Sequence, residues 1–255
     1  MTRLLTGLTL IPFAAYAILF APQWVFTVVV VALAAVCFHE YSGIATAYKL
    51  EINRAAGYGL GVILLLWNGD LARLYILAML VALVLALHVS DMALSLPSAG
   101  ALLLGVAYVF GSWRTAIELH KLSPYWLLFA ITINWIGDTA AYYAGRALGR
   151  RKLLPRVSPA KSWEGAYASL IGSATYGVVV LYWLIPAVTL WEAIGVSVCA
   201  NIAGQVGDLA ESALKRGAGV KDSGTLLPGH GGWLDRLDST LFSMPVVYLW
   251  LTRAN

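Results

Sequence analysis

The sequence predicts an all-α, polytopic integral membrane protein, with about nine transmembrane helices in a single membrane domain, residues 1–255. The chain is 60% hydrophobic and only 12% charged, whereas soluble domains are about 25% charged. Its mean hydropathy is +0.77. Ten tryptophans and thirteen tyrosines add residues that are enriched where a membrane meets water.

Apolar stretches give the expected positions of the membrane helices. A bilayer core of about 30 Å needs roughly 20 helical residues. The third stretch is short and glycine-rich, so eight spans is the alternative. The first has no clear small-residue cleavage site and is interpreted as a retained helix rather than a signal peptide. The nine spans are expected near residues 4–20, 22–38, 55–67, 71–88, 98–113, 124–143, 166–186, 190–214 and 237–252.

Basic residues predict the orientation. With nine spans, thirteen of the 17 lysines and arginines fall on the side of the N-terminus. Because basic loops remain in the cytoplasm, we expect the N-terminus and both charge-rich loops there. Topology signals or anionic lipid headgroups would explain some of this charge, and the chain has no soluble basic domain for nucleic acid. The thirteen are Arg3, Lys49, Arg54, Arg146, Arg150, Arg151, Lys152, Arg156, Lys161, Lys215, Arg216, Lys221 and Arg236.

The two cysteines, Cys37 and Cys199, both fall inside expected spans. We interpret them as small apolar packing residues rather than as a disulfide or a redox pair.

Acidic residues in or beside three of the spans point to a functional site, because such residues are costly in a membrane. Their spacing places each group on one helix face. Asn134, Asp138 and Tyr142 form the first group. The second is Asp208, Glu211, Ser212 and Lys215, and the third is Asp235, Asp238 and Ser239.

Carboxylates gathered in a medium of low dielectric repel each other, and a bound divalent cation removes that repulsion. The donors are oxygen atoms, without paired Cys or His spacing, which favours Mg²⁺ over zinc. A second monovalent or divalent cation is compatible with this set. Mg²⁺ together with Lys and Arg is typical of sites that handle phosphates.

Two loops fit a phosphate site. "SPAKSWEG" at 158–165 places Lys161 and Ser162 beside a turn, before an apolar helix. "GHGG" at 229–232 lets backbone N–H groups approach a ligand closely. It lies within "KDSGTLLPGHGGWLDRLDS" at 221–239, a polar stretch in an apolar chain.

Structural interpretations remain open for these residues. Asp138 and Asn134 could form a polar helix contact or a proton relay, and the 208–215 stripe could hold internal ion pairs. His230 could only shape a turn. His39 and Glu40, at the end of the second span, are interpreted as interfacial residues rather than ligands.

The stretch "SALKRGAGVKDSGTLLPGHGGWLDRLDS" resembles the signature of the phosphatidate cytidylyltransferase, or CDP-diacylglycerol synthase, family. "NWIGDTAAYYAGRALGR", "SPAKSWEG" and the opening "RLLTGLTLIPF" are similar to further parts of that family. Trp233 and Ala160 depart from its usual pattern without removing a charged residue.

The resemblance implies an enzyme of phospholipid biosynthesis, which transfers cytidylyl from CTP to phosphatidic acid and releases pyrophosphate. It also implies a homodimer in a bacterial cell inner membrane, with the active site facing the cytoplasm. Residues 1–120 would supply lipid access and dimer contacts, and residues 121–255 the catalytic helices and loops.

On this basis Asp208, Asp235, Lys215 and Arg236 are the expected catalytic residues. Asp208 and Asp235 would be the main metal ligands, supported by Asp138, Glu211 and Asp238. Substrate would contact Lys161, Ser162, Asn134, Ser212, Arg216, Lys221, Asp222, His230, Gly231 and Gly232.

Two other functions are alternatives. A CTP-dependent polyprenol or lipid kinase would release CDP instead of pyrophosphate. A cation-coupled transporter could also use membrane carboxylates, although transporter charges usually lie near the midplane in paired repeats.

Overall fold

A computed structural model describes residues 2–227, 229 and 231–253, with side chains from residue 11 onward. The expected all-α membrane fold is confirmed, and each of the nine expected spans coincides with a helical segment of the described chain. The N-terminal helices are α1 (Thr2–Leu19), α2 (Gln23–Ala47), α3 (Arg54–Leu66) and α4 (Leu71–Ala86). A continuous run, Met92–Leu122, follows as η1 (Met92–Leu94), α5 (Ser95–Gly105), the π-helical turn η2 (Val106–Gly111) and α6 (Ser112–Leu122).

The C-terminal half contains α7 (Pro124–Leu148), α8 (Trp163–Leu184), α9 (Leu190–Gly217) and α10 (Leu234–Thr252). Within the described residues, four helical segments are long and apolar enough to cross a membrane: α2, Met92–Leu122, α8 and α9. Helices α3 and α4 are shorter apolar helices. The number of nine crossings stays a prediction.

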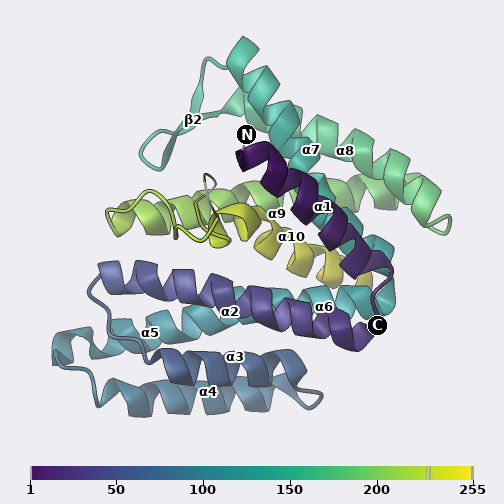
Figure 1. Ribbon diagram of the computed structural model, residues 1–255. Helices are drawn as coiled ribbons and strands as arrows, with labels where there is room; N and C mark the ends of the chain where they lie inside the picture. The colour runs from purple at the N-terminus through teal and green to yellow at the C-terminus, as the bar shows by residue number, and fades with distance from the viewer. Residues whose placement is uncertain (1, 228, 230, 254–255) are drawn as a thin grey trace.

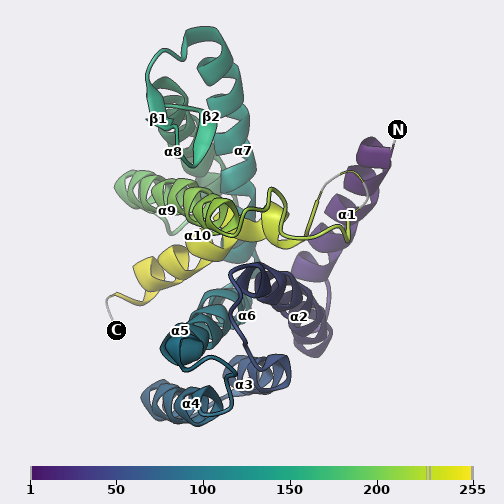
Figure 2. The same ribbon diagram turned by 90° about the vertical axis from the view of Figure 1, so that its left-hand side faces the viewer.

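The helices form two groups with α10 between them (Figures 1 and 2). One group comprises α2 to α6, and the other comprises α7, α8 and α9. Helix α10 packs against α9 and α7 on one side and against α6 and α2 on the other. A segment of the N-terminal half therefore lies beside the start of α10.

Aromatic residues fill the N-terminal group, whereas small and polar residues join the C-terminal helices. The Phe38 and Phe110 rings are fully buried, with centroids 5.3 Å apart. In the C-terminal group, the Asn201 amide donates to Ser169 Oγ and Ser173 Oγ, both at 2.9 Å. Small residues allow close helix approach in a membrane, where polar side chains can bond across the interface.

Among the described residues, a short two-stranded sheet interrupts the helices, which the all-α expectation did not include. Strands β1 (Lys152–Leu154) and β2 (Ser158–Ser162) form an antiparallel hairpin between α7 and α8, pairing Lys152 with Ser162. Ser162 then caps α8, since its Oγ accepts a hydrogen bond from Gly165 N–H at 3.2 Å. The hairpin fixes the direction of Lys161, which the sequence placed only beside a turn.

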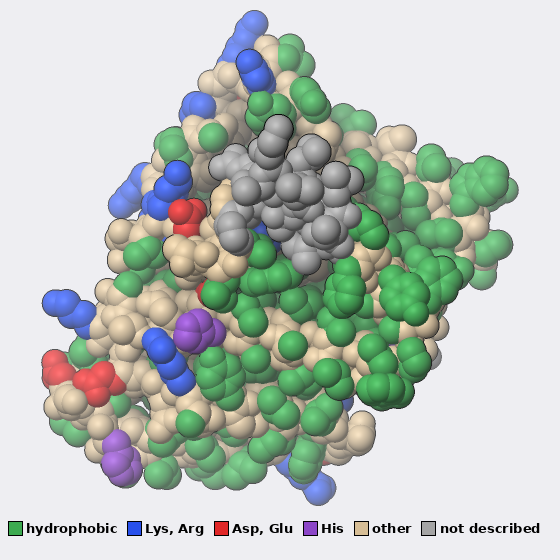
Figure 3. Space-filling model, viewed as in Figure 1, with side chains coloured by type: hydrophobic (Ala, Val, Ile, Leu, Met, Phe, Trp, Pro, Cys, Tyr) green, Lys and Arg blue, Asp and Glu red, His purple; other side chains and the backbone are tan. Residues whose placement is uncertain are grey.

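The surface agrees with a membrane environment. Trp183 and Trp191, beside the turn between α8 and α9, are 80% and 78% exposed. In Figure 3 hydrophobic side chains dominate the right-hand part of the surface, and Lys and Arg side chains gather at the upper left. Cys37 is buried, and both cysteines are free thiols, as expected for packing residues.

Candidate active site

Members of all three polar groups expected from the sequence line one cavity of about 320 Å³, whereas Tyr142, Glu211 and Ser212 are not among its described lining residues. Helix α7 supplies Asn134, Trp135 and Asp138; α9 supplies Asp208 and Lys215; the α9–α10 loop (residues 218–233) supplies Asp222; and α10 supplies Asp235, Arg236, Asp238, Ser239 and Thr240. Because α9 packs against both α7 and α10, groups up to about a hundred residues apart in the sequence share this space. The cavity is therefore acidic, with basic side chains at its wall.

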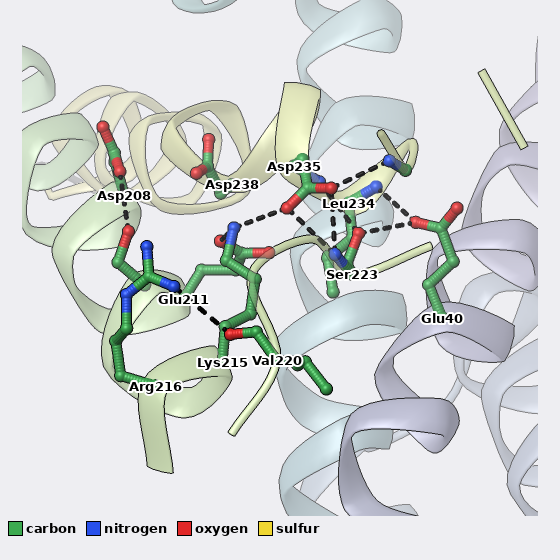
Figure 4. Close-up of polar contacts among 12 residues, drawn as sticks. Glu40, Asp208, Glu211, Lys215, Arg216, Val220, Ser223, Leu234, Asp235 and Asp238 are labelled. Carbon is green, nitrogen blue, oxygen red and sulfur yellow. Dashed lines mark hydrogen bonds and ion pairs between the residues drawn. The ribbon is translucent and has the colours of Figure 1, made fainter. Parts of the chain in front are cut away.

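Lys215 lies between two carboxylates (Figure 4). Its Nζ atom is 2.5 Å from Asp235 Oδ1 and also forms an ion pair with Glu211 Oε2. The Glu211 side chain is fully buried, and those of Lys215 and Asp235 are 9% and 5% exposed. Such a buried cluster is stable only while its charges are paired, so Lys215 holds the two carboxylates together.

The α9–α10 loop orients Asp235. Ser223 N–H donates to Asp235 Oδ2 at 2.9 Å and to Oδ1 at 3.1 Å, and Gly232 N–H donates to Oδ2 at 2.8 Å. Gly231 has φ +78°, and a Cβ there would lie 2.8 Å from Asp235 Oδ2. Glycine is required because other residues disfavour this φ and because the carboxylate occupies the space.

The hairpin approaches the cavity through Lys161. Its Nζ lies 2.5 Å from Asp208 Oδ2, and Ser212 Oγ donates to Asp208 Oδ1 at 3.3 Å. Both partners of this ion pair are about a quarter exposed, with side-chain exposures of 28%. Lys161 is therefore positioned at the cavity while it remains accessible to a ligand.

The other expected residues have more varied surroundings. Asn134 lines the cavity and donates to Ser243 Oγ at 2.8 Å. Asp238 is buried, and Ser239 N–H donates to its Oδ1 at 2.6 Å. Arg216 is exposed and donates to the Val220 carbonyl at 3.3 Å, away from the cavity lining.

The Gly-rich part of the loop is described in part. Lys221 is exposed and is not among the described cavity-lining residues, whereas Asp222 is. Gly232 N–H is hydrogen-bonded to Asp235. His230 lies outside the described residues.

Glu40 of α2 also belongs to this neighbourhood, and the interpretation of it as an interfacial residue is wrong. It is 3% exposed and accepts hydrogen bonds from Ser223 Oγ at 3.0 Å and Leu234 N–H at 2.8 Å (Figure 4). It also accepts a hydrogen bond from Trp233 N–H at 3.0 Å. A glutamate within a long apolar helix is itself a signal of function. Asp138 is a candidate site residue by this rule, and the same rule applies to Glu40.

The donor set suits a hard cation. Asp208 repels both Asp138 and Asp238 electrostatically, and these carboxylates line the same cavity. Oxygen donors of this kind fit Mg²⁺. As they are arranged, the described residues contain no group of three or more His, Cys, Asp or Glu that could hold a metal ion. The metal ligands stay a prediction.

Comparison with known proteins places this membrane site within a class of nucleotidyl-transferring enzymes. The model of the cytidylyltransferase family matches residues 1–253, and the chain belongs to this family.

Its relatives include the phosphatidate cytidylyltransferase of Staphylococcus saprophyticus, 37% identical over 185 residues, which cover 72% of this chain and 71% of that protein. The phosphatidate cytidylyltransferase of Staphylococcus aureus is 40% identical over 152 residues, 60% of this chain and 58% of the relative. The enzyme of the same name from Staphylococcus haemolyticus is 36% identical over 185 residues, 72% of this chain and 71% of the relative. The family resemblance found in the sequence is thus confirmed, and neither the kinase nor the transporter alternative receives support.

Proposed function

We propose that the protein transfers the cytidylyl group of CTP to phosphatidic acid, forming CDP-diacylglycerol and pyrophosphate. The observation that carries this proposal is the cavity lined by Lys215, Arg236 and the carboxylates of α7, α9 and α10, with Lys161 paired to Asp208 of that lining, in a chain of the cytidylyltransferase family. Both substrates are anionic phosphates, and the lipid substrate requires a site in a membrane protein. The apolar helices supply that setting.

The reaction joins two phosphates. An oxygen of the phosphatidate phosphate attacks the α-phosphorus of CTP, the new P–O–P bond forms, and the bond to pyrophosphate breaks in line. A phosphate monoester is already ionised at neutral pH, so the site requires no strong general base. Positioning and charge stabilisation account for most of the acceleration in reactions of this kind.

Basic residues of the chain would hold the reacting groups. Lys161, near the end of strand β2, is accessible to the triphosphate of CTP. Arg236 lines the cavity from α10, where a guanidinium can bind phosphate through two hydrogen bonds. Lys215 keeps the Asp235 carboxylate in place and offsets charge that develops on the leaving pyrophosphate.

Mg²⁺ is the expected cofactor. Asp208 and Asp235 would hold it, with Asp138, Glu211 and Asp238 as supporting residues; all but Glu211 line the cavity. When bound, Mg²⁺ neutralises phosphate charge and orients the leaving group. The hydrogen bonds to Asp235 from Ser223 and Gly232 provide the outer support that ligating carboxylates commonly have.

The location follows from the charge pattern. Ten of the thirteen basic residues on the side expected in the cytoplasm, where CTP is available, lie within 146–161 and 215–236, in or beside the hairpin and the α9–α10 loop. In a bacterium, this pattern supports an active site on the cytoplasmic face of the inner membrane. The homodimer implied by the resemblance stays a prediction.

The test is a reaction of the purified full chain in mixed micelles with phosphatidic acid, labelled CTP and Mg²⁺. We expect cytidine label in the lipid with one pyrophosphate released per lipid formed, and no turnover after chelation of Mg²⁺ with EDTA. Release of CDP without cytidine in the lipid would instead identify a lipid kinase. Absence of CTP consumption with any lipid phosphate would contradict the proposal.

A further inference from the structure

Glu40 connects the N-terminal half of the chain to the α9–α10 loop through a set of buried hydrogen bonds. Its Oε2 atom accepts from Ser223 Oγ at 3.0 Å and from Leu234 N–H at 2.8 Å, and its Oε1 atom accepts from Trp233 N–H at 3.0 Å. These donors lie 183 to 194 residues away in the sequence. A single side chain of α2 therefore fixes both the middle of the loop and the start of α10.

This carboxylate caps α10 from another helix. The first N–H groups of a helix have no partners within it, and among the described residues Trp233, at the cap position of α10, makes no side-chain cap hydrogen bond of its own. Glu40 accepts from the N–H groups of Trp233 and Leu234, and Ser223 Oγ accepts from Asp235 N–H at 3.3 Å. A negative charge at this end also suits the helix dipole.

Ser223 links Glu40 to Asp235. Its hydroxyl donates to Glu40, and its backbone N–H donates to both oxygens of Asp235. Asp235 in turn contacts Lys215. The hydrogen bonds thus form a continuous chain, Glu40–Ser223–Asp235–Lys215, from α2 to the wall of the cavity (Figure 4).

The packing leaves this arrangement little freedom. A Cβ at Gly224 would lie 2.7 Å from Glu40 Oε1, and one at Gly232 would collide with both Glu40 and Ser223. Glu40 is 3% exposed, and the same side chain that caps α10 also holds Ser223, whose backbone N–H donates to Asp235. The contacts of Glu40 therefore extend to the site and are not confined to the end of the helix.

We propose that Glu40 is a positioning residue for the reaction: acting through Ser223 and the start of α10, it orients the Asp235 carboxylate toward Lys215 and the cavity. This inference rests on the proposed cytidylyl transfer. It assigns part of the catalytic machinery to α2.

The test compares Glu40→Gln, Ser223→Ala and the double variant with wild type. Glutamine keeps the size of the side chain but turns an NH₂ group toward N–H donors, so the hydrogen bonds cannot all form. We expect kcat to fall about 10- to 100-fold, the usual effect of removing such an outer partner. The KM for CTP should change less than about threefold, because the lost contact is not to substrate. The fold loss of kcat in the double variant should be smaller than the product of the fold losses in the two single variants, because the two residues act together.

Glu51→Gln is the matched control. Glu51 follows the same helix, is exposed and accepts from Ser90 N–H at 3.2 Å and Ser90 Oγ at 3.1 Å, at a different cavity. Its variant should keep kcat within about twofold of wild type, as for a surface substitution.

A second measurement is independent of activity. Trypsin cleaves after Lys221, which is exposed in the α9–α10 loop, and loss of the Glu40 contacts should accelerate this cleavage in Glu40→Gln but not in Glu51→Gln. If Glu40→Gln fails to fold, the inference is tested with Ser223→Ala, which keeps the two backbone contacts of Glu40. The kcat and the cleavage rate of this variant are then the two measurements.

A folded Glu40→Gln protein with wild-type kcat and wild-type cleavage would overturn the inference while leaving cytidylyl transfer intact. Fully multiplicative losses in the double variant would also overturn it. A wild-type protein that forms no CDP-diacylglycerol would contradict the proposed function, and the cleavage rates would still test the contact itself.

Discussion

Lys161 Nζ lies 2.5 Å from Asp208 Oδ2, in a salt bridge that joins strand β2 of the hairpin to helix α9. The two residues are 47 positions apart, and β2 leads directly into the cap of α8. The hairpin is therefore held over the acidic cavity by a charge pair that remains partly open to solvent. Because both side chains of this pair are 28% exposed, an incoming phosphate could replace Asp208 as the partner of Lys161.

We predict that Lys161→Met lowers kcat/KM for CTP about 10- to 100-fold, the range expected for a charged hydrogen bond of about 1.5–3 kcal/mol. Lys152→Met, an exposed position of the same hairpin, serves as the control and should stay near wild type. Steady-state kinetics with varied CTP measures both. Equal losses in the two variants would show that the hairpin contributes only general positive charge.

The buried cluster of Glu211, Lys215 and Asp235 gives a prediction about stability. Lys215→Met leaves two buried carboxylates without their cation, which typically costs about 3–5 kcal/mol. We expect a large fall in the thermal unfolding midpoint in detergent, together with loss of turnover. Adding Glu211→Gln should recover much of the midpoint, since one unpaired charge is removed, but no turnover. A single Lys215→Met variant as stable as wild type would contradict the charge assignment.

Asp235→Asn separates folding from catalysis. Asparagine retains one oxygen for Ser223 and Gly232 N–H but offers no negative charge to Lys215 or to a cation. We expect a folded protein in detergent whose transfer of cytidine label to lipid is abolished. The control is Asp70→Asn, because Asp70 caps α4 by accepting from Ala72 N–H at 2.9 Å. Wild-type turnover of Asp235→Asn would remove Asp235 from the set of metal ligands.

The helices were predictable because apolar runs of membrane length specify them directly. The sequence also predicted that the polar residues of α7, α9 and α10 share a site, because acidic residues at spacings of three and four lie on one face of a helix. The hairpin at 152–162 was not predicted. Its strands are three and five residues long, too short for an alternating pattern to stand out from a polar loop.

The partners of the predicted residues depend on the tertiary fold. No local pattern relates Glu40 to Ser223, 183 residues away, and only the packing of α10 against α2 brings them together. Ser162 and Gly232 were expected to contact substrate, and their observed bonds, to Gly165 and Asp235, also depend on backbone direction. Residue type indicated the neighbourhood, while the fold determines which atoms pair.

Gly207 tests whether the spacing of α9 and α10 sets the geometry of the site. A Cβ at this buried glycine would lie 2.7 Å from the Asp238 carbonyl oxygen and 2.8 Å from Phe242 Cδ2. Because the first of these atoms is backbone, α10 must move away from α9 in Gly207→Ala. Overpacking of this kind costs about 1–3 kcal/mol, partly offset by the gain of about 1 kcal/mol in helix propensity.

We expect Gly207→Ala to lose more activity than stability, because its neighbour Asp208 lines the same cavity as Asp238 of α10 and a shift of about 1 Å at a reacting site can cost 100-fold. Gly59→Ala in α3 is the control: no atom of the described residues lies within 4 Å of the added Cβ, so the unfolding midpoint and kcat should both be unchanged or slightly improved. The measurements are kcat per folded molecule and the unfolding midpoint of each variant. A Gly207→Ala protein with wild-type kcat would mean that the cavity tolerates movement of α10, and that Asp208 and Asp238 do not act on one ligand.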